Sequence, residues 1–98
     1  MNKDQLIREI SDYLKQSGGN PREWYVGISQ DARKRLFQDH SVDEKKDSWI
    51  YRTADSNKEA RESEDYFLNK VGTDGGPGGG DTSSTMVYAY KKNSHTNP

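Results

Sequence analysis

The chain is short of large aliphatic side chains, and this limits what it can fold into. Only 14 of its 98 residues are Leu, Ile, Val or Phe, a share typical of disordered chains. Two observations nonetheless favour a folded domain. The formal net charge is −1, so the chain does not repel itself, and 10% of the residues are aromatic, with Trp24 and Trp49 inside strand-like runs. The sequence therefore predicts a single domain over residues 1–92, with a thin core built largely from aromatic rings.

The residue types that are absent or rare exclude several classes of site. The chain has no cysteine, so disulfides and cysteine-based zinc sites cannot form, and His40 and His95 are too few for a His-rich metal site. No segment reaches the ~20 apolar residues of a membrane span, and no signal-peptide pattern is present. The sequence predicts a cytoplasmic protein without a membrane partner, monomeric by default. Because the net charge is near zero, DNA would have to bind at a local basic patch.

Apolar periodicity and capping residues predict three helices and three strands. The expected elements are a helix over 4–16, a strand over 24–29, a helix over 32–40, a strand over 49–54, a helix from Ser56 to about Val71 and a strand over 86–92. Residues 73–85 are Gly-rich and have no helix or strand pattern, and residues 93–98 are expected to be a disordered tail. The expected fold is α+β: a small three-stranded, mainly antiparallel sheet flanked by three helices.

One charged residue lies inside the apolar stripe of the third predicted helix. At about 100° per residue, Glu64 falls near the centre of that stripe. The other members of the stripe are Ala60, Phe67, Leu68 and Val71. A carboxylate is costly to bury without a partner. Glu64 is therefore expected to pair with a cation such as Arg35 or Arg52, to bind a metal ion, or to border a wet cleft.

Four consecutive segments of the chain carry a family resemblance. They are the strand WYVGIS, the helix DARKRLFQDH, the strand WIYRTA and the helix in which Glu64 follows Ala60 by four residues. Over residues 24–71 they resemble the second half of the signature of GIY-YIG nucleases. The first half, a Gly-Ile-Tyr strand that forms a hairpin with the second, is absent. We expect the C-terminal strand MVYAYKK to pair with WYVGIS in its place, with Tyr88 or Tyr90 supplying the missing side chain.

The resemblance implies a metal-dependent endonuclease that hydrolyses phosphodiester bonds of DNA. In that family a single glutamate binds the divalent metal ion, Mg²⁺ or Mn²⁺, and here it would be Glu64. The metal ion and the helix arginine, here Arg35, neutralise phosphate charge in the transition state. Tyrosine or histidine side chains position or deprotonate water, and these roles would fall to Tyr25, His40 and Tyr88. The spacing from Arg35 to His40 is one residue longer than in the family pattern.

The resemblance also suggests residues that contact DNA. Gly27 takes the place of the signature's glycine, where backbone or substrate must approach closely. Arg33, Lys34 and Arg52 are the candidate DNA-binding cations. Acidic residues interrupt the basic patch, so an ordinary surface of mixed charge is the alternative interpretation.

Each candidate residue also has an ordinary structural interpretation. Tyr25 is then a sheet residue with its hydroxyl at the rim, Arg35 is a solvated helix residue, and His40 interacts with the dipole at a helix C-terminus. Trp24 and Trp49 are expected in the core rather than as platforms for base stacking. Two other functions remain open. One is a non-catalytic GIY-YIG-like module that binds nucleic acid or a protein partner, and the other is an unrelated α+β protein–protein module.

Overall fold

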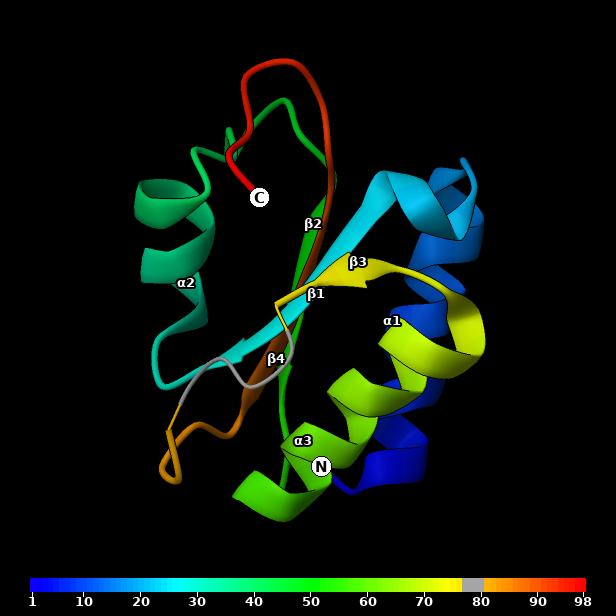
Figure 1. The fold of residues 1–98 in the computed structure, drawn as a ribbon, viewed down its shortest axis with the longest axis vertical. Helices are drawn as coiled ribbons and strands as arrows, with labels where there is room; N and C mark the ends of the chain where they lie inside the picture. Colours follow the sequence, from blue (N-terminus) through cyan, green and yellow to red (C-terminus); the bar gives the residue numbers. More distant parts are fainter. Residues whose placement is uncertain (77–80) are drawn as a thin grey trace.

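The computed structural model describes residues 1–76 and 81–98 and shows an α+β fold (Figure 1). Its helices are α1 (Lys3–Ser17), α2 (Ala32–Lys34) and α3 (Asn57–Tyr66). The 3-10 turn η1 (Pro21–Glu23) precedes the first strand, and the π-helical turns η2 (Arg35–Asp39) and η3 (Phe67–Val71) extend α2 and α3. The strands are β1 (Trp24–Ser29), β2 (Trp49–Thr53), β3 (Asp74–Gly75) and β4 (Met86–Lys91).

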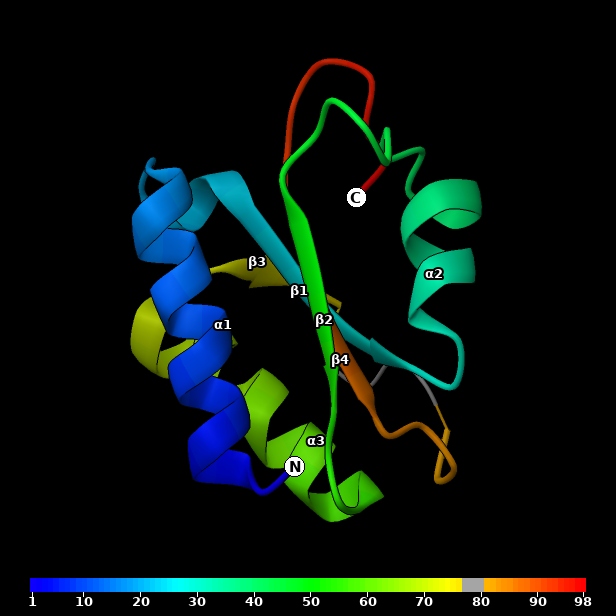
Figure 2. The ribbon, with the colours of Figure 1, turned by 180° about the vertical axis from the view of Figure 1, so that it is seen from behind.

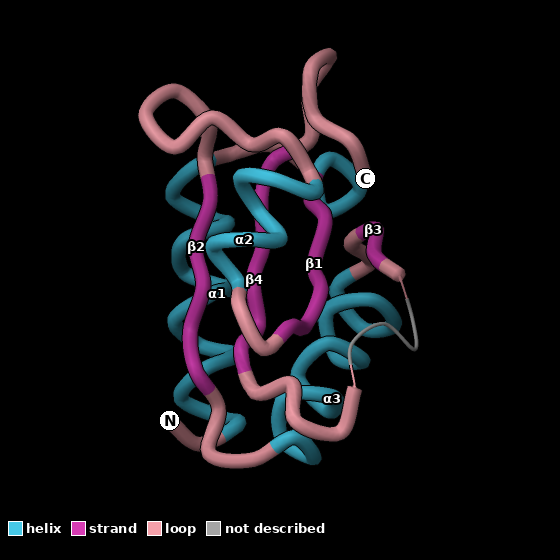
Figure 3. The backbone as a smooth tube through the Cα atoms, turned by 90° about the vertical axis from the view of Figure 1, so that its left-hand side faces the viewer, coloured by secondary structure: helices cyan, strands magenta, loops and turns pink. Residues whose placement is uncertain are grey.

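The last strand of the chain, β4, lies inside the sheet. The strand order is β2-β4-β1-β3, and β4 is antiparallel to both of its neighbours (Figure 3). The expected pairing of MVYAYKK with WYVGIS is therefore confirmed. Its register places Tyr88 opposite Gly27 and Tyr90 opposite Tyr25.

The expected count of three strands is wrong, because Asp74 and Gly75 form a fourth. They pair in parallel with Tyr25 and Val26 along the outer edge of β1, within the segment 73–85 that the sequence predicts to be a loop. A two-residue strand is too short to produce a recognisable alternation of apolar and polar residues. Glycine permits this pairing, because a Cβ on Gly75 would lie only 2.6 Å from the carbonyl oxygen of Val26.

The helices divide between the two faces of the sheet. α1 and α3 cover one face and α2 covers the other (Figures 1 and 2). The larger apolar core lies beneath α1 and α3 and contains Trp24, Val87 and Ala89. Tyr88 and Tyr90 alternate with these residues along β4 and pack in the smaller core beneath α2. The alternation along β4 thus sends its small apolar side chains to one core and its tyrosines to the other.

The helix starts follow the predicted capping residues, but the second helix changes its geometry after one turn. An oxygen of the Asp31 side chain accepts from the Lys34 amide at 3.1 Å, and Ser56 Oγ accepts from the Glu59 amide at 3.2 Å. Beyond Lys34 the backbone is π-helical, and the His40 amide donates to the carbonyl oxygen five residues earlier, at 2.8 Å. The expected helix over 32–40 is thus one α-helical turn followed by a π-helical turn.

The C-terminal residues 93–98, which were expected to be a disordered tail, fold back onto the domain. The Asn97 amide donates to the carbonyl of His40 at 2.8 Å, and Thr96 is buried. The sequence offers no sign of these contacts, because Asn97 lies 57 positions after His40 in the chain. Within residues 1–76 and 81–98, no helix has the length and apolar composition that crossing a bilayer requires.

Candidate functional site

Tyr88 and Gly27 are register partners on β4 and β1, and they approach closely on the α2 side of the sheet. A Cβ on Gly27 would lie 2.5 Å from Tyr88 Oη and 2.7 Å from Tyr88 Cζ. The φ angle of Gly27 is not positive, so the requirement for glycine is space rather than an unusual backbone conformation. The absence of a side chain at Gly27 lets the Tyr88 phenol lie across the backbone of β1.

Tyr25 brings a second phenol to the same place and is packed against three other rings. Its ring centroid lies 4.8 Å from that of His40, 5.3 Å from that of Tyr90 and 6.4 Å from that of Tyr88. His40, Tyr88 and Tyr90 are buried, whereas Tyr25 is half-buried. Burial is the main cause that raises the pKa of the Tyr25 phenol. Tyr25 is therefore the ring of this cluster that a ligand could reach.

The hydrogen bonds of His40 fix where its ring proton resides. Nδ1 lies 2.6 Å from the carbonyl oxygen of Asn97, and since a carbonyl can only accept, Nδ1 must carry the proton. Burial lowers the pKa of the His40 imidazole below its usual value, which keeps the ring neutral at pH 7. Nε2 is then an acceptor, and the Tyr88 hydroxyl donates to it at 2.8 Å. Tyr90 Oη lies 3.2 Å from Nδ1 and can share its proton.

Arg35 places a positive charge beside the phenols. It opens the π-helical turn η2, and the Tyr88 hydroxyl of β4 interacts with both Arg35 and His40. Burial raises the pKa of Tyr88 to about 12, and the Arg35 guanidinium beside it acts in the opposite direction. Arg35 is 40% exposed, and its Nε lies 3.7 Å from Asp39 Oδ2. The guanidinium is thus partly exposed, while its Nε is buried.

Glu64 is buried on α3, and its charge acts on the phenols across the edge of β1. Its side chain is 5% exposed, and within the described part of the chain Oε2 has no hydrogen-bond partner. Burial raises the pKa of Glu64 to about 7, and the charge of Arg61 opposes that rise. The carboxylate also adds to the effect of burial in raising the pKa of Tyr25 and Tyr88.

Neither cation that the sequence suggested as a partner for Glu64 forms an ion pair with it among residues 1–76 and 81–98. Arg35 interacts instead with Asp39, and Arg52 Nε binds Glu9 Oε1 at 2.7 Å. Arg52 and Glu9 lie on the side of the sheet that α1 covers. Glu64 is therefore a buried carboxylate with one oxygen that the described residues leave unsatisfied.

The unsatisfied oxygen of Glu64 fits a metal ion that is held by one carboxylate. Across the described residues, no three His, Asp or Glu side chains are arranged to hold a metal ion on their own. Mg²⁺ tolerates such a site, because it commonly keeps several waters and shares substrate phosphate oxygens. Glu64 is thus the residue that would hold Mg²⁺ or Mn²⁺ here, with water and phosphate as the other ligands.

The three candidate DNA-binding cations do not converge on the phenols. Arg33 pairs with Glu44 at 2.6 Å, and its guanidinium lies 5.1 Å from the ring centroid of Phe37. Arg52 is on the opposite side of the sheet, whereas Lys34 is exposed on α2 beside Arg35. Of these three cations, Lys34 is the one that borders a hollow next to Arg35. That hollow, about 450 Å³, is also lined by Ser29, Gln30, Asp31, Asp39, Asp81 and Ser84.

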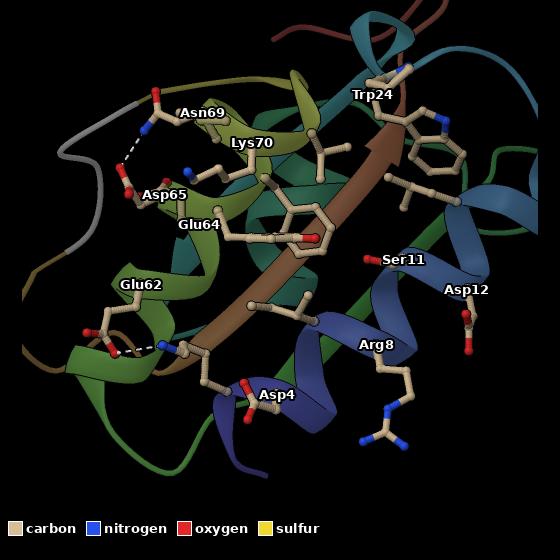
Figure 4. Close-up of a pocket in the computed structure, with 18 of the residues that line it drawn as sticks. Asp4, Arg8, Ser11, Asp12, Trp24, Glu62, Glu64, Asp65, Asn69 and Lys70 are labelled. Atoms are coloured by element: carbon tan, nitrogen blue, oxygen red, sulfur yellow. Dashed lines mark hydrogen bonds and ion pairs between the residues drawn. The ribbon is translucent and has the colours of Figure 1, made fainter.

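A larger groove of about 1310 Å³ runs between α1 and α3 (Figure 4). Its apolar lining includes Ile7 and Phe67, and charged side chains of both signs border it, among them Asp4, Arg8 and Lys70. Glu64 also lines the groove, on the side of the sheet that α1 and α3 cover. The mixed charge of the groove selects no class of ligand, whereas the phenol cluster gathers an arginine, a histidine and three tyrosines.

Comparisons with protein-family models, with curated proteins and with solved structures find no match to this chain.

Proposed function

We propose that the chain is a metal-dependent nuclease related to the GIY-YIG enzymes, in which β4 takes the place of the missing first strand. The observation that carries the proposal is the position of the Tyr88 phenol across Gly27, beside Tyr25 and Arg35. Two phenols on adjacent antiparallel strands, an arginine on the following helix and a buried carboxylate on α3 make a set suited to phosphodiester hydrolysis. β4 comes last in the chain rather than first, so its tyrosine cannot be found by searching for the motif in sequence order.

The accessible groups of the site suit phosphate binding. Arg35 and Tyr25 are the partly exposed members, and a guanidinium binds phosphate oxygens well. A divalent ion on Glu64, when bound, would supply further neutralisation of phosphate charge in the transition state. Lys34, next to Arg35 on the rim, adds a positive charge that steers DNA towards the site.

The buried groups of the site suit proton removal from water. A water at the Tyr88 oxygen gives that oxygen a proton while Tyr88 passes its own proton to Nε2 of neutral His40. The resulting hydroxide forms a bond to phosphorus, and the phosphorus–oxygen bond to the leaving group breaks. The leaving oxygen then takes a proton from solvent, and His40 releases the proton on Nε2 to solvent. Arg35 stabilises the negative charge that passes through the Tyr88 oxygen.

A non-catalytic module that binds nucleic acid or a protein is the second candidate, and the burial of the proton acceptors favours it. Tyr88 is 1% exposed and His40 is 5% exposed, so the Tyr88 oxygen has little access to water. A domain that kept this fold and lost its chemistry would retain Tyr88 as a packing residue. The net charge of −1 also favours this candidate, because it gives DNA no general attraction.

Cleavage assays on supercoiled plasmid and on single-stranded DNA with Mg²⁺ or Mn²⁺ test the proposal. The matched pair is Glu64→Gln and Glu62→Gln, since both remove a charge from α3 but Glu62 is exposed and lies 3.8 Å from Lys3. We expect cleavage by the native protein and by Glu62→Gln, and none by Glu64→Gln. DNA binding without cleavage by any of the three would establish the non-catalytic module instead.

A further inference from the structure

Asn97 and His40 are joined by two hydrogen bonds that use backbone atoms of Asn97. The Asn97 amide donates to the His40 carbonyl at 2.8 Å, and the Asn97 carbonyl accepts from His40 Nδ1 at 2.6 Å. The first bond holds the two backbones side by side, and the second holds the imidazole. Since both contacts come from one residue, the position of the tail and the orientation of the ring are fixed together.

The segment that carries Asn97 is anchored independently of His40. Asn93 Nδ2 donates to Asp47 Oδ1 at 2.8 Å, and His95 Nε2 lies 2.6 Å from Asp47 Oδ2. Thr96 Oγ1 accepts from the Asn93 amide at 3.0 Å and closes the turn. These bonds attach the segment to the loop before β2. The carbonyl of Asn97 therefore faces His40 from a fixed support and not from a free chain end.

The alternative tautomer of His40 is disfavoured by the same arrangement. With the proton on Nε2, the lone pair of Nδ1 would face the lone pairs of the Asn97 carbonyl at 2.6 Å. The Tyr88 hydroxyl would then have to accept from Nε2 rather than donate to it. The titratable and charged groups that face or act on the ring are Tyr25 of β1, Tyr88 and Tyr90 of β4, and Arg35 and Asp39 of η2.

We propose that residues 93–98 are a positioning element of the site: the backbone carbonyl of Asn97 fixes the His40 proton on Nδ1, so that the Tyr88 hydroxyl donates to Nε2. Asn97 is then a positioning residue that acts through His40. Its part in hydrolysis rests on the proposed function, because only there does Nε2 receive a proton. The control of the tautomer does not depend on that function.

Nitrogen NMR of the 98-residue chain, labelled in its histidine rings, tests the proposal without any substrate. Asn97→Ala keeps both backbone bonds and removes only the side-chain amide that donates to Ser41 Oγ at 3.2 Å. Asn97→Pro removes the amide proton that binds the His40 carbonyl, and the proline ring in its place pushes residue 97 away from that carbonyl. We expect His40 to be protonated on Nδ1 in the native protein and in Asn97→Ala, and to populate both tautomers in Asn97→Pro.

A third variant, Tyr88→Phe, shows whether the Asn97 carbonyl or the Tyr88 hydroxyl determines which nitrogen of His40 carries the proton. If the Asn97 carbonyl sets it, Tyr88→Phe keeps the proton on Nδ1, whereas mixed tautomers in this variant would overturn the proposal. The proposal would also be overturned if His40 carried its proton on Nε2 in the native protein. The same holds if Asn97→Pro folded and still kept the His40 proton on Nδ1. If the His40 tautomers follow these expectations but the native protein does not cleave DNA, the positioning role of residues 93–98 is supported and the proposed function is wrong.

Discussion

The phenol of Tyr88 lies across the backbone of Gly27, with its Oη 2.5 Å from the point where a Cβ would stand. The two residues are partners in the register of β1 and β4, so the contact follows from the pairing itself. Any side chain at Gly27 would therefore displace the phenol from its place beside Tyr25 and His40. The fold and the candidate site thus depend on the same glycine.

Replacing Gly27 with alanine is expected to destabilise the domain. The new methyl group would overlap the Tyr88 ring and force it to move, and overpacking of this kind costs about 1–3 kcal/mol. Urea unfolding of Gly27→Ala measures the loss. In a Tyr88→Leu background the same substitution should cost much less, because the smaller side chain leaves room for the methyl group. An equal cost in both backgrounds would show that the contact is not the reason for glycine.

Glu64→Gln is expected to change how stability depends on pH in the metal-free protein. The pKa of the buried carboxyl is raised from 4.5 to about 7, so the native state holds its proton more tightly than the unfolded chain does. The resulting stabilisation is present below pH 4.5 and is lost as the pH rises through about 7. Glutamine cannot ionise, so Glu64→Gln should be more stable than the native protein at pH 8, on the order of 2 kcal/mol.

Urea unfolding at pH 5 and pH 8 measures this change, with Glu62→Gln as the control on the exposed side of α3. Glu62→Gln should follow the native protein at both pH values. If Glu64→Gln were less stable than the native protein at pH 8, the carboxylate would have a stabilising partner and would not be an unsatisfied group.

Arg35→Gln is expected to lower the rate of DNA cleavage by about 10²–10³-fold, because the guanidinium neutralises charge in the transition state. Arg35→Lys should recover only part of the loss, because an ammonium group cannot make the two parallel contacts of a guanidinium. Arg8→Gln removes the same charge from α1, on the opposite side of the sheet, and serves as the control. Similar losses in Arg8→Gln and Arg35→Gln would mean that only the general charge of the protein matters.

The sequence predicts most of the larger elements because their causes are local. Asp31 and Ser56 cap helices through bonds to amides three residues away, and the alternation along β4 separates Val87 from Tyr88. The burial of Glu64 also follows from helical periodicity alone. These features depend on neighbours in the chain, which is the information that a single sequence holds.

The remaining features depend on contacts between distant segments. The pairing of Asp74 and Gly75 with β1 leaves no periodic signal, and the bond from His40 to Asn97 joins residues 57 positions apart. The π-helical turn after Lys34 likewise leaves no sign in the apolar pattern. Such features become visible only when the sheet brings the segments together.

Titration of Mn²⁺ into uniformly ¹⁵N-labelled protein tests the central claim most directly, because the paramagnetic ion broadens the amides near its site. Our account predicts saturable broadening centred on Glu64, retained in Glu62→Gln and lost in Glu64→Gln. Broadening that is equal in the native protein and in Glu64→Gln, or no localised broadening up to millimolar Mn²⁺, would contradict it.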